Sequence, residues 1–436
     1  MNIYRYGTRK TEARLRRIVN RGLDYSRQHY RQVSAIIGDV KKNGDAAIEK
    51  YSNQFDAPRQ KASQFQVSRA EMDAAVKKAD KGFMRALNRA VRQIESFHRR
   101  QVEQSWISTE RSGVVVGQQV TPVDSAGIYV PGAKGGETPL VSTVLMGAIP
   151  AKTAGVGRVI MVTPPRKDGS VNPQLLVAAK KVGVDAIYKV GSAWAIAALA
   201  YGTETIARVD MIAGPGNLYV ALAKKILSAT VGIDMIAGPS EIMVIADAAA
   251  NPAYIAADLL SQAEHDEMSS AVLVTDSEPL ARKTAGEVES QLAGLSRRKT
   301  AEGALAAYGA IIVVEDMEAA FSIANRFAPE HLELHVREPF EWLGHVRNAG
   351  AVFLGEHTPE PVGDYVAGPN HTLPTAGSAR FASALSTPHF MKKTSIVHYS
   401  RDAFRAEAAD VIKIAETEGL TAHANAIKVR LSQKGK

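Results

Sequence analysis

A glutamine and a histidine three residues apart form the first candidate site. They are Gln262 and His265 of the segment SQAEHD, which ends a stretch with the apolar spacing of an amphipathic helix. Side chains three residues apart lie on one face of a helix. An amide oxygen and an imidazole nitrogen placed in this way could bind one metal ion. The alternative interpretation is a polar helix end at the surface.

A carboxylate stands next to a histidine in a second segment, APEHLE. Glu330 and His331 follow Pro329, which interrupts regular structure. In a regular strand the two side chains would point to opposite faces, whereas an irregular turn would let both reach one cavity. A histidine beside a carboxylate suits general base catalysis near neutral pH. The alternative is a solvated charge pair.

Two further segments carry isolated titratable residues. The segment EHTPEPVGDYVAGPNHTLP holds Glu360, Asp364 and His371 among four prolines and two glycines. Such a loop can hold functional groups rigidly, although it could equally be a long surface loop. Near the C-terminus, ETEGLTAHANA contains Glu418 and His423. On their own these two residues indicate only the surface of a helix.

The signals for nucleotide binding are weaker. The GxGxxG motif of many dinucleotide-binding turns is absent from the sequence. The nearest candidates are Gly132–Gly136 (GAKGG) and Gly214–Asn217 (GPGN). The second lies between a predicted strand and a predicted helix start, where backbone N–H groups favour anions. A simple turn explains the same residues.

Composition narrows the possible chemistry. The chain contains no cysteine, which excludes disulfides, iron–sulfur clusters and a thiolate zinc site. A metal site must therefore be built from His, Asp, Glu or Gln side chains.

The net charge of +8 could attract anions, including nucleic acids and dinucleotides. The positive residues are spread along the chain, apart from the helical segment RKTEARLRRIVNR between Arg9 and Arg21. The interleaving of basic and aromatic residues that is typical of nucleic-acid binding is absent. No signal peptide is visible, and no apolar run reaches the roughly 18 residues of a membrane span. We therefore expect a cytoplasmic protein without nucleic-acid or membrane partners.

The spacing of apolar residues predicts the elements that must position these side chains. Residues 1–105 are expected to be largely helical. Strands are expected between residues 114 and 130. From there, β-rich and helical segments alternate, which indicates parallel βαβ units with helices on both faces. The hexapeptide DMIAGP occurs twice, at 210–215 and 234–239, and predicts two similar strand-to-loop turns. We divide the chain into a largely helical region, 1–124, two α/β domains, 125–238 and 239–382, and a helical tail, 383–436.

Together these segments resemble those of histidinol dehydrogenases. The resemblance is strongest over residues 233–265, IDMIAGPSEIMVIADAAANPAYIAADLLSQAEH, and continues in GDAAIEKYSNQFD, APEHLE, GDYVAGPNHTLPT and EGLTAHANA. The motifs occur in order over essentially the whole chain. The resemblance implies an α/β fold of two facing, incomplete Rossmann-like parallel-sheet domains with small helical additions at both ends. It also implies a homodimer with shared active sites, in which the tail crosses to the partner.

The resemblance further implies a reaction and roles for individual residues. The reaction is oxidation of L-histidinol to L-histidine through L-histidinal, the last steps of histidine biosynthesis, with NAD and one Zn²⁺ ion per subunit. Glu330 and His331 match the catalytic pair. The positions that match zinc ligands are Gln262, His265, Asp364 and His423. These four positions and His331 also match substrate contacts. Further substrate contacts match Ser240, Glu360, His371 and Glu418. Cofactor contacts match Tyr129 and Asn217, together with position 194.

Two departures fall in the cofactor half. The stretch GAKGGET, within Tyr129–Met146, differs from the family's usual GG-x-A, and Trp194 of GSAWAIAALA stands where the family usually has a glutamine. Trp194 could pack in a helix or stack on the dinucleotide. The alternative function is a paralogous zinc- and NAD-dependent dehydrogenase of another small alcohol, such as a sulfonated diol. Glu360, His371 and Glu418 favour histidinol, because they match contacts to the amino alcohol.

Overall fold

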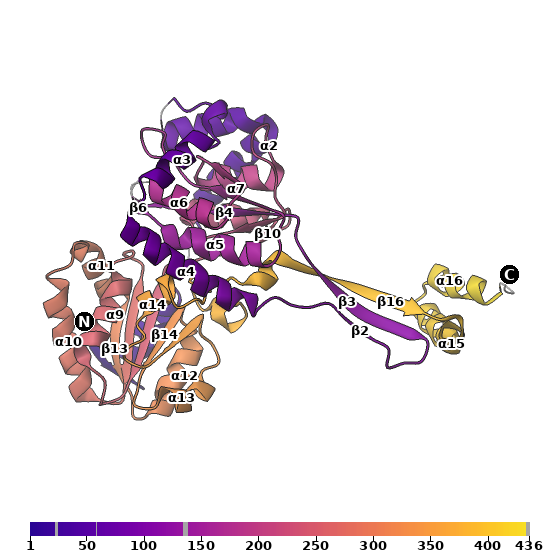
Figure 1. Cartoon of the computed structure of the whole chain (residues 1–436). Helices are drawn as coiled ribbons and strands as arrows, with labels where there is room; N and C mark the ends of the chain where they lie inside the picture. Colours follow the sequence, from indigo (N-terminus) through magenta and orange to yellow (C-terminus); the bar gives the residue numbers. More distant parts are fainter. Residues whose placement is uncertain (22–24, 58, 134–137, 433–436) are drawn as a thin grey trace. The chain divides into compact units, whose positions relative to one another are not determined.

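The computed structural model describes residues 1–21, 25–57, 59–133 and 138–432 (Figure 1). The chain divides into two units. The first comprises residues 1–101 and 123–390, and the second comprises residues 102–122 and 391–436. Among the described helices, none is long and apolar enough to cross a membrane.

A six-stranded parallel sheet lies in the first unit and carries most of the candidate site. Its strands are, in spatial order, β1 (Ile3–Arg5), β13 (Gly309–Val313), β12 (Ser270–Thr275), β11 (Glu241–Ala246), β14 (His331–His335) and β15 (Ala351–Leu354). Helices α9 (Pro252–Ala263), α10 (Glu278–Leu292) and α11 (Arg298–Tyr308) cover one face. Helices α1 (Arg9–Val19) and α12 (Met317–Phe327) cover the other. Short helices α13 (Pro339–Trp342) and α14 (Glu360–Tyr365) flank β15 in sequence.

The strands of this sheet are buried on both faces, as a parallel sheet requires. In β11, Ile242 and Val244 pack with α9, whereas Met243 and Ile245 pack with α12. This alternation places successive side chains in different hydrophobic clusters. Glu241, the first residue of β11, is the one acidic residue of this otherwise apolar strand.

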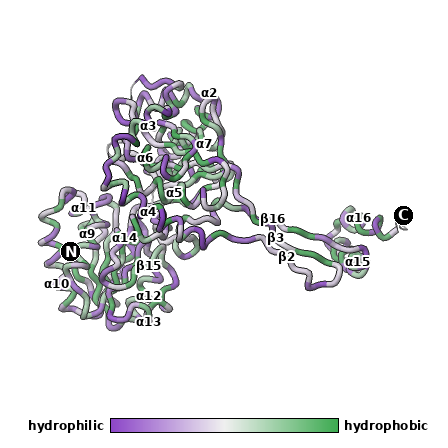
Figure 2. Tube along the Cα trace, in the orientation of Figure 1, coloured by the Kyte–Doolittle hydropathy of each residue, from purple (hydrophilic) through white to green (hydrophobic). Residues whose placement is uncertain are grey.

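A five-stranded parallel sheet forms the rest of the first unit. Its order is β10 (Gly232–Ile233), β9 (Met211–Ala213), β4 (Ser125–Tyr129), β7 (Arg158–Val162) and β8 (Ala186–Tyr188). Helices α2 (Arg27–Phe55), α7 (Ser192–Tyr201) and α8 (Leu218–Leu227) share one hydrophobic cluster with it. The remaining helices are α3 (Arg69–Lys77), α4 (Lys81–Arg99), α5 (Val141–Thr153) and α6 (Pro173–Lys181). Hydrophobic residues gather on the inner helices α5 and α7 (Figure 2).

Short elements complete the first unit. Strands β5 (Gly132–Ala133) and β6 (Thr138–Pro139) form an antiparallel pair. Four 3-10 helices cover Ala62–Gln64, Leu343–His345, Ser378–Arg380 and Thr387–Phe390.

The second unit is an antiparallel sheet followed by two helices. Its strands are ordered β16 (Met391–Tyr399), β3 (Val114–Pro122) and β2 (Trp106–Ser108). Helices α15 (Arg401–Thr417) and α16 (Thr421–Ser432) pack against each other. Several large apolar side chains of this unit are exposed, among them Ile107, Val397 and Ile414.

The predicted fold class, α/β with two Rossmann-like parallel-sheet domains and helical additions at both ends, is confirmed. Three of the described strands, β1, β2 and β16, lie outside the predicted pattern. β1 has only three residues, too few to show alternation, and it joins the N-terminal residues to the edge of the six-stranded sheet. β16 is exposed along most of its length, so it has no buried face to reveal it in the sequence.

Candidate active site

The candidate active site is centred on the turn before β14. Ala328 adopts a left-handed conformation with φ 54° at the end of α12, and Pro329 follows it. Glu330 then precedes the strand, and His331 is its first residue. The Oε2 atom of Glu330 lies 3.6 Å from the Nδ1 atom of His331. The predicted irregular turn, which brings both side chains together, is therefore confirmed.

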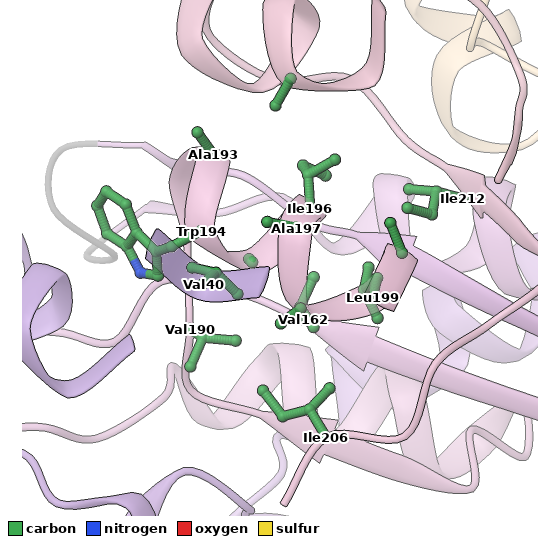
Figure 3. Close-up of a cluster of buried hydrophobic side chains, with 14 of the residues drawn as sticks. Val40, Val162, Val190, Ala193, Trp194, Ile196, Ala197, Leu199, Ile206 and Ile212 are labelled. Carbon is green, nitrogen blue, oxygen red and sulfur yellow. The ribbon is translucent and has the colours of Figure 1, made fainter. Parts of the chain in front are cut away.

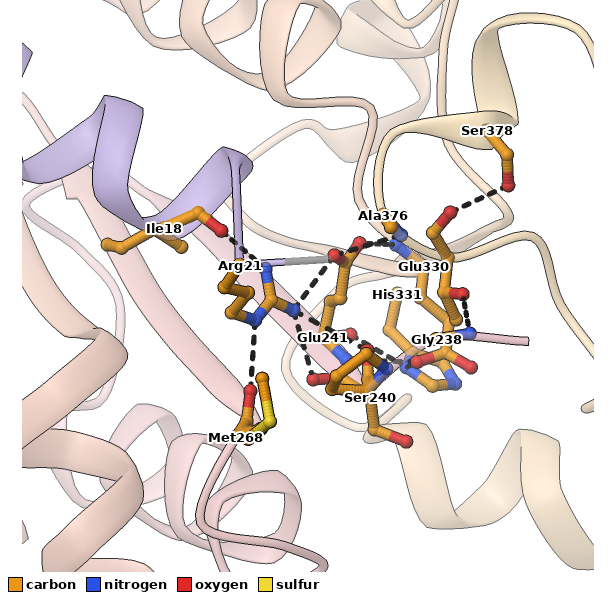
Figure 4. Close-up of polar contacts among 12 residues, drawn as sticks. Ile18, Arg21, Gly238, Ser240, Glu241, Met268, Glu330, His331, Ala376 and Ser378 are labelled. Atoms are coloured by element: carbon orange, nitrogen blue, oxygen red, sulfur yellow. Dashed lines mark hydrogen bonds and ion pairs between the residues drawn. The ribbon is translucent and has the colours of Figure 1, made fainter. Parts of the chain in front are cut away.

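Glu330 and Glu241 hold each other in place at the start of neighbouring strands (Figure 4). The Glu241 N–H donates to Glu330 Oε2 at 2.9 Å, and the Glu330 N–H donates to Glu241 Oε2 at 3.1 Å. Both side chains are buried. Burial raises the pKa of Glu330 well above its usual range, against the opposing effect of the Glu241 N–H.

The backbone of Glu241 also determines the tautomer of His331. The Nδ1 atom of His331 lies 2.9 Å from the Glu241 carbonyl oxygen. Because a carbonyl can only accept, Nδ1 must carry the proton, and Nε2 keeps its lone pair. Nε2 is buried without a hydrogen-bond partner among the described residues. Burial lowers the pKa of His331, so the ring is held neutral with a free base.

Two carboxylates one helical turn apart face this base. Glu360 and Asp364 lie at the two ends of α14, and their oxygens and a His331 nitrogen all fall within 4.8 Å of one another. The Nε2 atom of His331 is 4.0 Å from Glu360 Oε1, and His371 Nδ1 is 3.7 Å from Asp364 Oδ1. The structure therefore brings together four of the predicted residues: His331, Glu360, Asp364 and His371.

The two carboxylates titrate in opposite directions. Burial, with the charge of Asp364 as the next cause, raises the pKa of Glu360 to about 10. Burial also acts to raise the pKa of Asp364, but interactions with His371, His331 and Glu360 together outweigh burial and lower the pKa of that carboxyl. The environment therefore favours the neutral form of Glu360 and the charged form of Asp364.

The predicted helical pair of Gln262 and His265 needs a correction. α9 ends at Ala263 and Glu264 caps it, so His265 lies beyond the helix rather than on its face. The turn nevertheless continues, because the His265 N–H donates to the Gln262 carbonyl at 3.2 Å. Gln262 is almost fully buried, and its Oε1 has no hydrogen-bond partner among the described residues. His265 is exposed but lies within electrostatic reach of Asp364.

The other predicted substrate and metal residues come from different elements. Ser240 immediately precedes β11 and is half-buried. Glu418 caps the end of α15 and His423 lies in α16, both exposed on the second unit. Among the described residues, the close group around Asp364 includes neither His265 nor His423.

Two acidic residues that the sequence analysis does not single out support the site. Glu241 is the first, through the contacts above. Glu333 of β14 is the second, and its Oε1 accepts from the Glu360 N–H at 2.8 Å. Glu333 belongs to a buried group with Asp258 and His335, in which burial and the charge of Glu333 raise the pKa of Asp258 to about 8. A carboxylate inside an apolar β-rich run is the signal that could have revealed both residues.

The cofactor candidates Tyr129 and Asn217 lie at the carboxyl ends of strands β4 and β9, where ligands of open α/β sheets bind. Tyr129 is buried, and its hydroxyl accepts from the Ser192 N–H at 3.1 Å. A Cβ on Gly214 would lie 2.1 Å from the Tyr129 carbonyl oxygen, so only glycine fits there. Asn217 caps α8, as the GPGN segment predicts. Residues 134–137 of GAKGGET lie outside the described residues.

Trp194 lies inside the hydrophobic core (Figure 3). Its ring is 3% exposed. The ring centroids of Tyr51 and Phe55, both on α2, lie 5.9 and 5.8 Å away at small interplanar angles. This arrangement favours the packing interpretation, and a contact with the cofactor stays a prediction.

Comparison with known proteins identifies the family. A family model described as histidinol dehydrogenase matches residues 20–431. Histidinol dehydrogenase of Carboxydothermus hydrogenoformans is 52% identical over 403 residues, which are 92% of this chain and 94% of that protein. The enzyme of Desulfotalea psychrophila is 50% identical and covers 92% of each chain. The chain belongs to the histidinol dehydrogenase family.

The structure agrees with this family assignment. The crystal structure of histidinol dehydrogenase from Elizabethkingia anophelis matches with a TM-score of 0.92 at 38% identity, covering 99% of this chain and 98% of that one. The resemblance noted from the motifs is therefore confirmed. As a histidinol dehydrogenase family member, the protein is an oxidoreductase of histidine biosynthesis that acts on a small molecule.

The packing of Trp194 can be tested by two substitutions. We expect Trp194→Ala to lower the free energy of unfolding by about 3–5 kcal/mol, because it leaves a cavity in the core. Trp194→Phe keeps a ring beside Tyr51 and Phe55, so it should stay close to the wild type in stability and in KM for NAD. Denaturant unfolding and steady-state kinetics measure both. A well-folded Trp194→Phe protein whose KM for NAD rises several-fold would show that the indole contacts the cofactor.

Proposed function

We propose that this protein oxidises L-histidinol to L-histidine through L-histidinal, using two NAD in turn and one Zn²⁺ ion per subunit. The observation that carries the proposal is the Nε2 atom of His331, which lies among carboxylates and is buried without a hydrogen-bond partner in the described part of the chain. A neutral imidazole with a free lone pair suits removal of a hydroxyl proton.

The residues divide the chemistry between them. His331 takes the hydroxyl proton through Nε2 as the first hydride leaves the carbon for NAD, which gives the aldehyde. Glu330 accepts a proton from the water that hydrates the aldehyde, and its raised pKa suits that step. His331 releases its first proton to solvent, and NADH is exchanged for the second NAD. His331 then takes a hydroxyl proton of the hydrated aldehyde as the second hydride leaves for NAD, which gives the acid. We assign the dinucleotide to the β4 and β9 end of the five-stranded sheet, near Tyr129, Trp194 and Asn217.

The proposed zinc ligands are Gln262, His265, Asp364 and His423. They are nitrogen and oxygen donors, which zinc accepts in the absence of cysteine. Zinc has no redox role and would serve as a template that orients the imidazole and amine of the substrate. The buried Gln262 Oε1, without a hydrogen-bond partner among the described residues, supports this assignment, because an unsatisfied buried acceptor is costly unless a ligand uses it.

The charge of the site favours an amino alcohol over a sulfonated one. The charge of Asp364 raises the cost of charging both Glu330 and Glu360, and the charge of Glu330 adds to the cost for Glu360. An ammonium group relieves that repulsion, whereas a sulfonate adds to it. We therefore assign Ser240, Glu360, His371 and Glu418 to contacts with histidinol.

We further propose a homodimer with shared active sites, in which the tail, residues 383–436, crosses to the partner and supplies Glu418 and His423. In support, both residues are exposed on the second unit together with large apolar side chains such as Ile414. Exposed apolar side chains that gather on one unit are typical of a protein interface. The four regions 1–124, 125–238, 239–382 and 383–436 remain our proposed domain division.

Removing zinc tests the metal assignment. Exhaustive chelation should abolish turnover, and added zinc should restore it. Gln262→Leu should lower zinc affinity at least about tenfold, the effect known for groups that merely orient metal ligands. Gln291→Leu, on α10, is the control and should leave the zinc content unchanged. Full activity in a verified metal-free sample would contradict the assignment.

The stoichiometry tests the two oxidations. Each histidinol should give two NADH and one histidine. His331→Asn should slow the oxidation of both histidinol and histidinal by about 100- to 10,000-fold, because both lose their general base. Glu330→Gln should chiefly slow oxidation of the aldehyde, because only that half-reaction needs activated water. A ratio of one NADH, with free aldehyde accumulating, would overturn the proposal.

Mixing two inactive variants tests the shared site. In a hybrid dimer of His423→Ala and His265→Ala chains, one of the two shared sites has both histidines intact. Random exchange should therefore restore about a quarter of wild-type activity. Sites contained within one chain would give no recovery, even with subunit exchange proven by mass spectrometry.

A further inference from the structure

A fully buried arginine, the last residue of the basic segment between Arg9 and Arg21, lies behind the catalytic pair. Arg21 follows α1, and its side chain is 1% exposed. It satisfies its donors with carbonyl oxygens of Met268 at 3.0 Å and Ile18 at 2.8 Å, and with Glu241 Oε1 at 2.8 Å (Figure 4). Weaker contacts reach the carbonyl oxygens of Pro239 and Ser240. The guanidinium therefore joins the end of α1 to the start of β11.

Glu241 connects Arg21 to the catalytic residues through hydrogen bonds. Its Oε1 accepts from Arg21 and from the Ala376 N–H at 3.1 Å, and its Oε2 accepts from the Glu330 N–H at 3.1 Å. Its own N–H donates to Glu330, and its carbonyl oxygen is the partner of His331 Nδ1. Every polar group of Glu241 is thus committed, and two of them determine the orientation of Glu330 and the tautomer of His331.

We propose that Arg21 is a positioning residue for catalysis, acting through Glu241 to hold Glu330 and the Nδ1–H tautomer of His331. The inference rests on the function proposed above. Arg21 touches neither of the catalytic side chains itself.

The physical reason is the state of the Glu241 carboxylate. A buried carboxylate is costly unless a charge and hydrogen bonds compensate it, and Arg21 supplies both. Without Arg21, Glu241 would take up a proton. A protonated carboxyl accepts hydrogen bonds more weakly than a carboxylate. The hydrogen bonds from the N–H groups of Glu330 and Ala376 would then weaken, and the start of β11 would be free to shift against β14.

The chain offers a matched control on α1, the helix that Arg21 follows. Arg14 of α1 also donates to several carbonyl oxygens, among them those of Gly309 at 3.1 Å and Ala306 at 3.1 Å. Among the described residues, the hydrogen bonds of its side chain go to backbone carbonyl oxygens, and none goes to the catalytic pair. Loss of Arg14 therefore tests what detaching α1 alone does to the enzyme.

The experiment compares the zinc-loaded, full-length wild type with Arg21→Met, Arg21→Lys, Glu241→Gln, the Arg21→Met/Glu241→Gln double variant and Arg14→Met. We expect Arg21→Met to lower kcat about 10- to 100-fold, the scale of a small misplacement of catalytic groups. KM for histidinol and the zinc content should change less than about twofold. The kcat of Arg21→Lys should lie between those of Arg21→Met and the wild type, because an ammonium keeps the charge but lacks the forked donors of a guanidinium. Arg14→Met should lower Tm but keep kcat.

Two further outcomes separate positioning from general destabilisation. The double variant should be no slower than Glu241→Gln, because both changes act through one carboxylate. An unchanged kcat in Arg21→Met, additive losses in the double variant, or a kcat loss that follows zinc loss would each overturn the inference. If Arg21→Met does not fold, Arg21→Lys and Glu241→Gln, which preserve side-chain length, decide by the same criteria.

A readout that needs no turnover keeps the two proposals separable. With ¹⁵N-labelled histidine and His331→Asn for assignment, solid-state NMR reports which ring nitrogen of His331 carries the proton. The wild type should show the Nδ1–H form, and Arg21→Met a mixture of both tautomers. If the wild type does not oxidise histidinol but the His331 tautomer still differs between the wild type and Arg21→Met, only the proposed function is contradicted. An unaltered tautomer in Arg21→Met contradicts the positioning role alone.

Discussion

The site depends on one buried carboxylate at the start of a central strand. Glu241 receives N–H donors from Arg21, Glu330 and Ala376, which come from three separate stretches of the chain. Backbone N–H groups that lie just before a strand have no hydrogen-bond partner in the sheet. When such groups are buried, a side chain must accept their hydrogen bonds. Glu241 does so, and it also sets the register in which Ile242 lies opposite His331. The catalytic pair is therefore built into the edge of the sheet rather than attached by a free loop.

In the two parallel sheets, the candidate residues lie at opposite ends of the strands. In the five-stranded sheet, Tyr129 and the Gly214 turn lie at the carboxyl ends of their strands, where open α/β sheets usually bind ligands. In the six-stranded sheet, Glu241 and His331 are the first residues of β11 and β14. Strand starts present N–H groups, which suit carboxylates such as Glu330 and Glu241. The rule that ligands bind at the carboxyl ends of the strands therefore predicts the proposed cofactor site, but it does not predict the position of the catalytic pair.

Local chemistry in the sequence predicts much of this, and long-range pairing limits the rest. The alternation of strands and helices predicts the α/β class, and Pro329 predicts the turn that brings Glu330 to His331. Arg21 and Glu241 are 220 residues apart in the sequence, and neither segment contains a signal that predicts their contact. The end of α9 before His265 also escapes the pattern, because the turn continues with helical spacing after the helix has ended. Trp194 shows the reverse case: a substitution within a motif suggests function, whereas its apolar neighbours already indicate a core position.

The crowding of acids explains why such rigid support is needed. Glu330 and Glu360 are buried, and the neighbouring charge of Asp364 raises the cost of charging each of them. Burial places the pKa of Glu360 at about 10, so a proton keeps that group neutral. A cation that binds between these carboxylates stabilises their charged forms, and the proton on Glu360 becomes easier to release. Cation binding and proton release are thus linked at this site. The linkage holds only while the distances between the groups are fixed, which is what the hydrogen bonds of Glu241 and Glu333 provide.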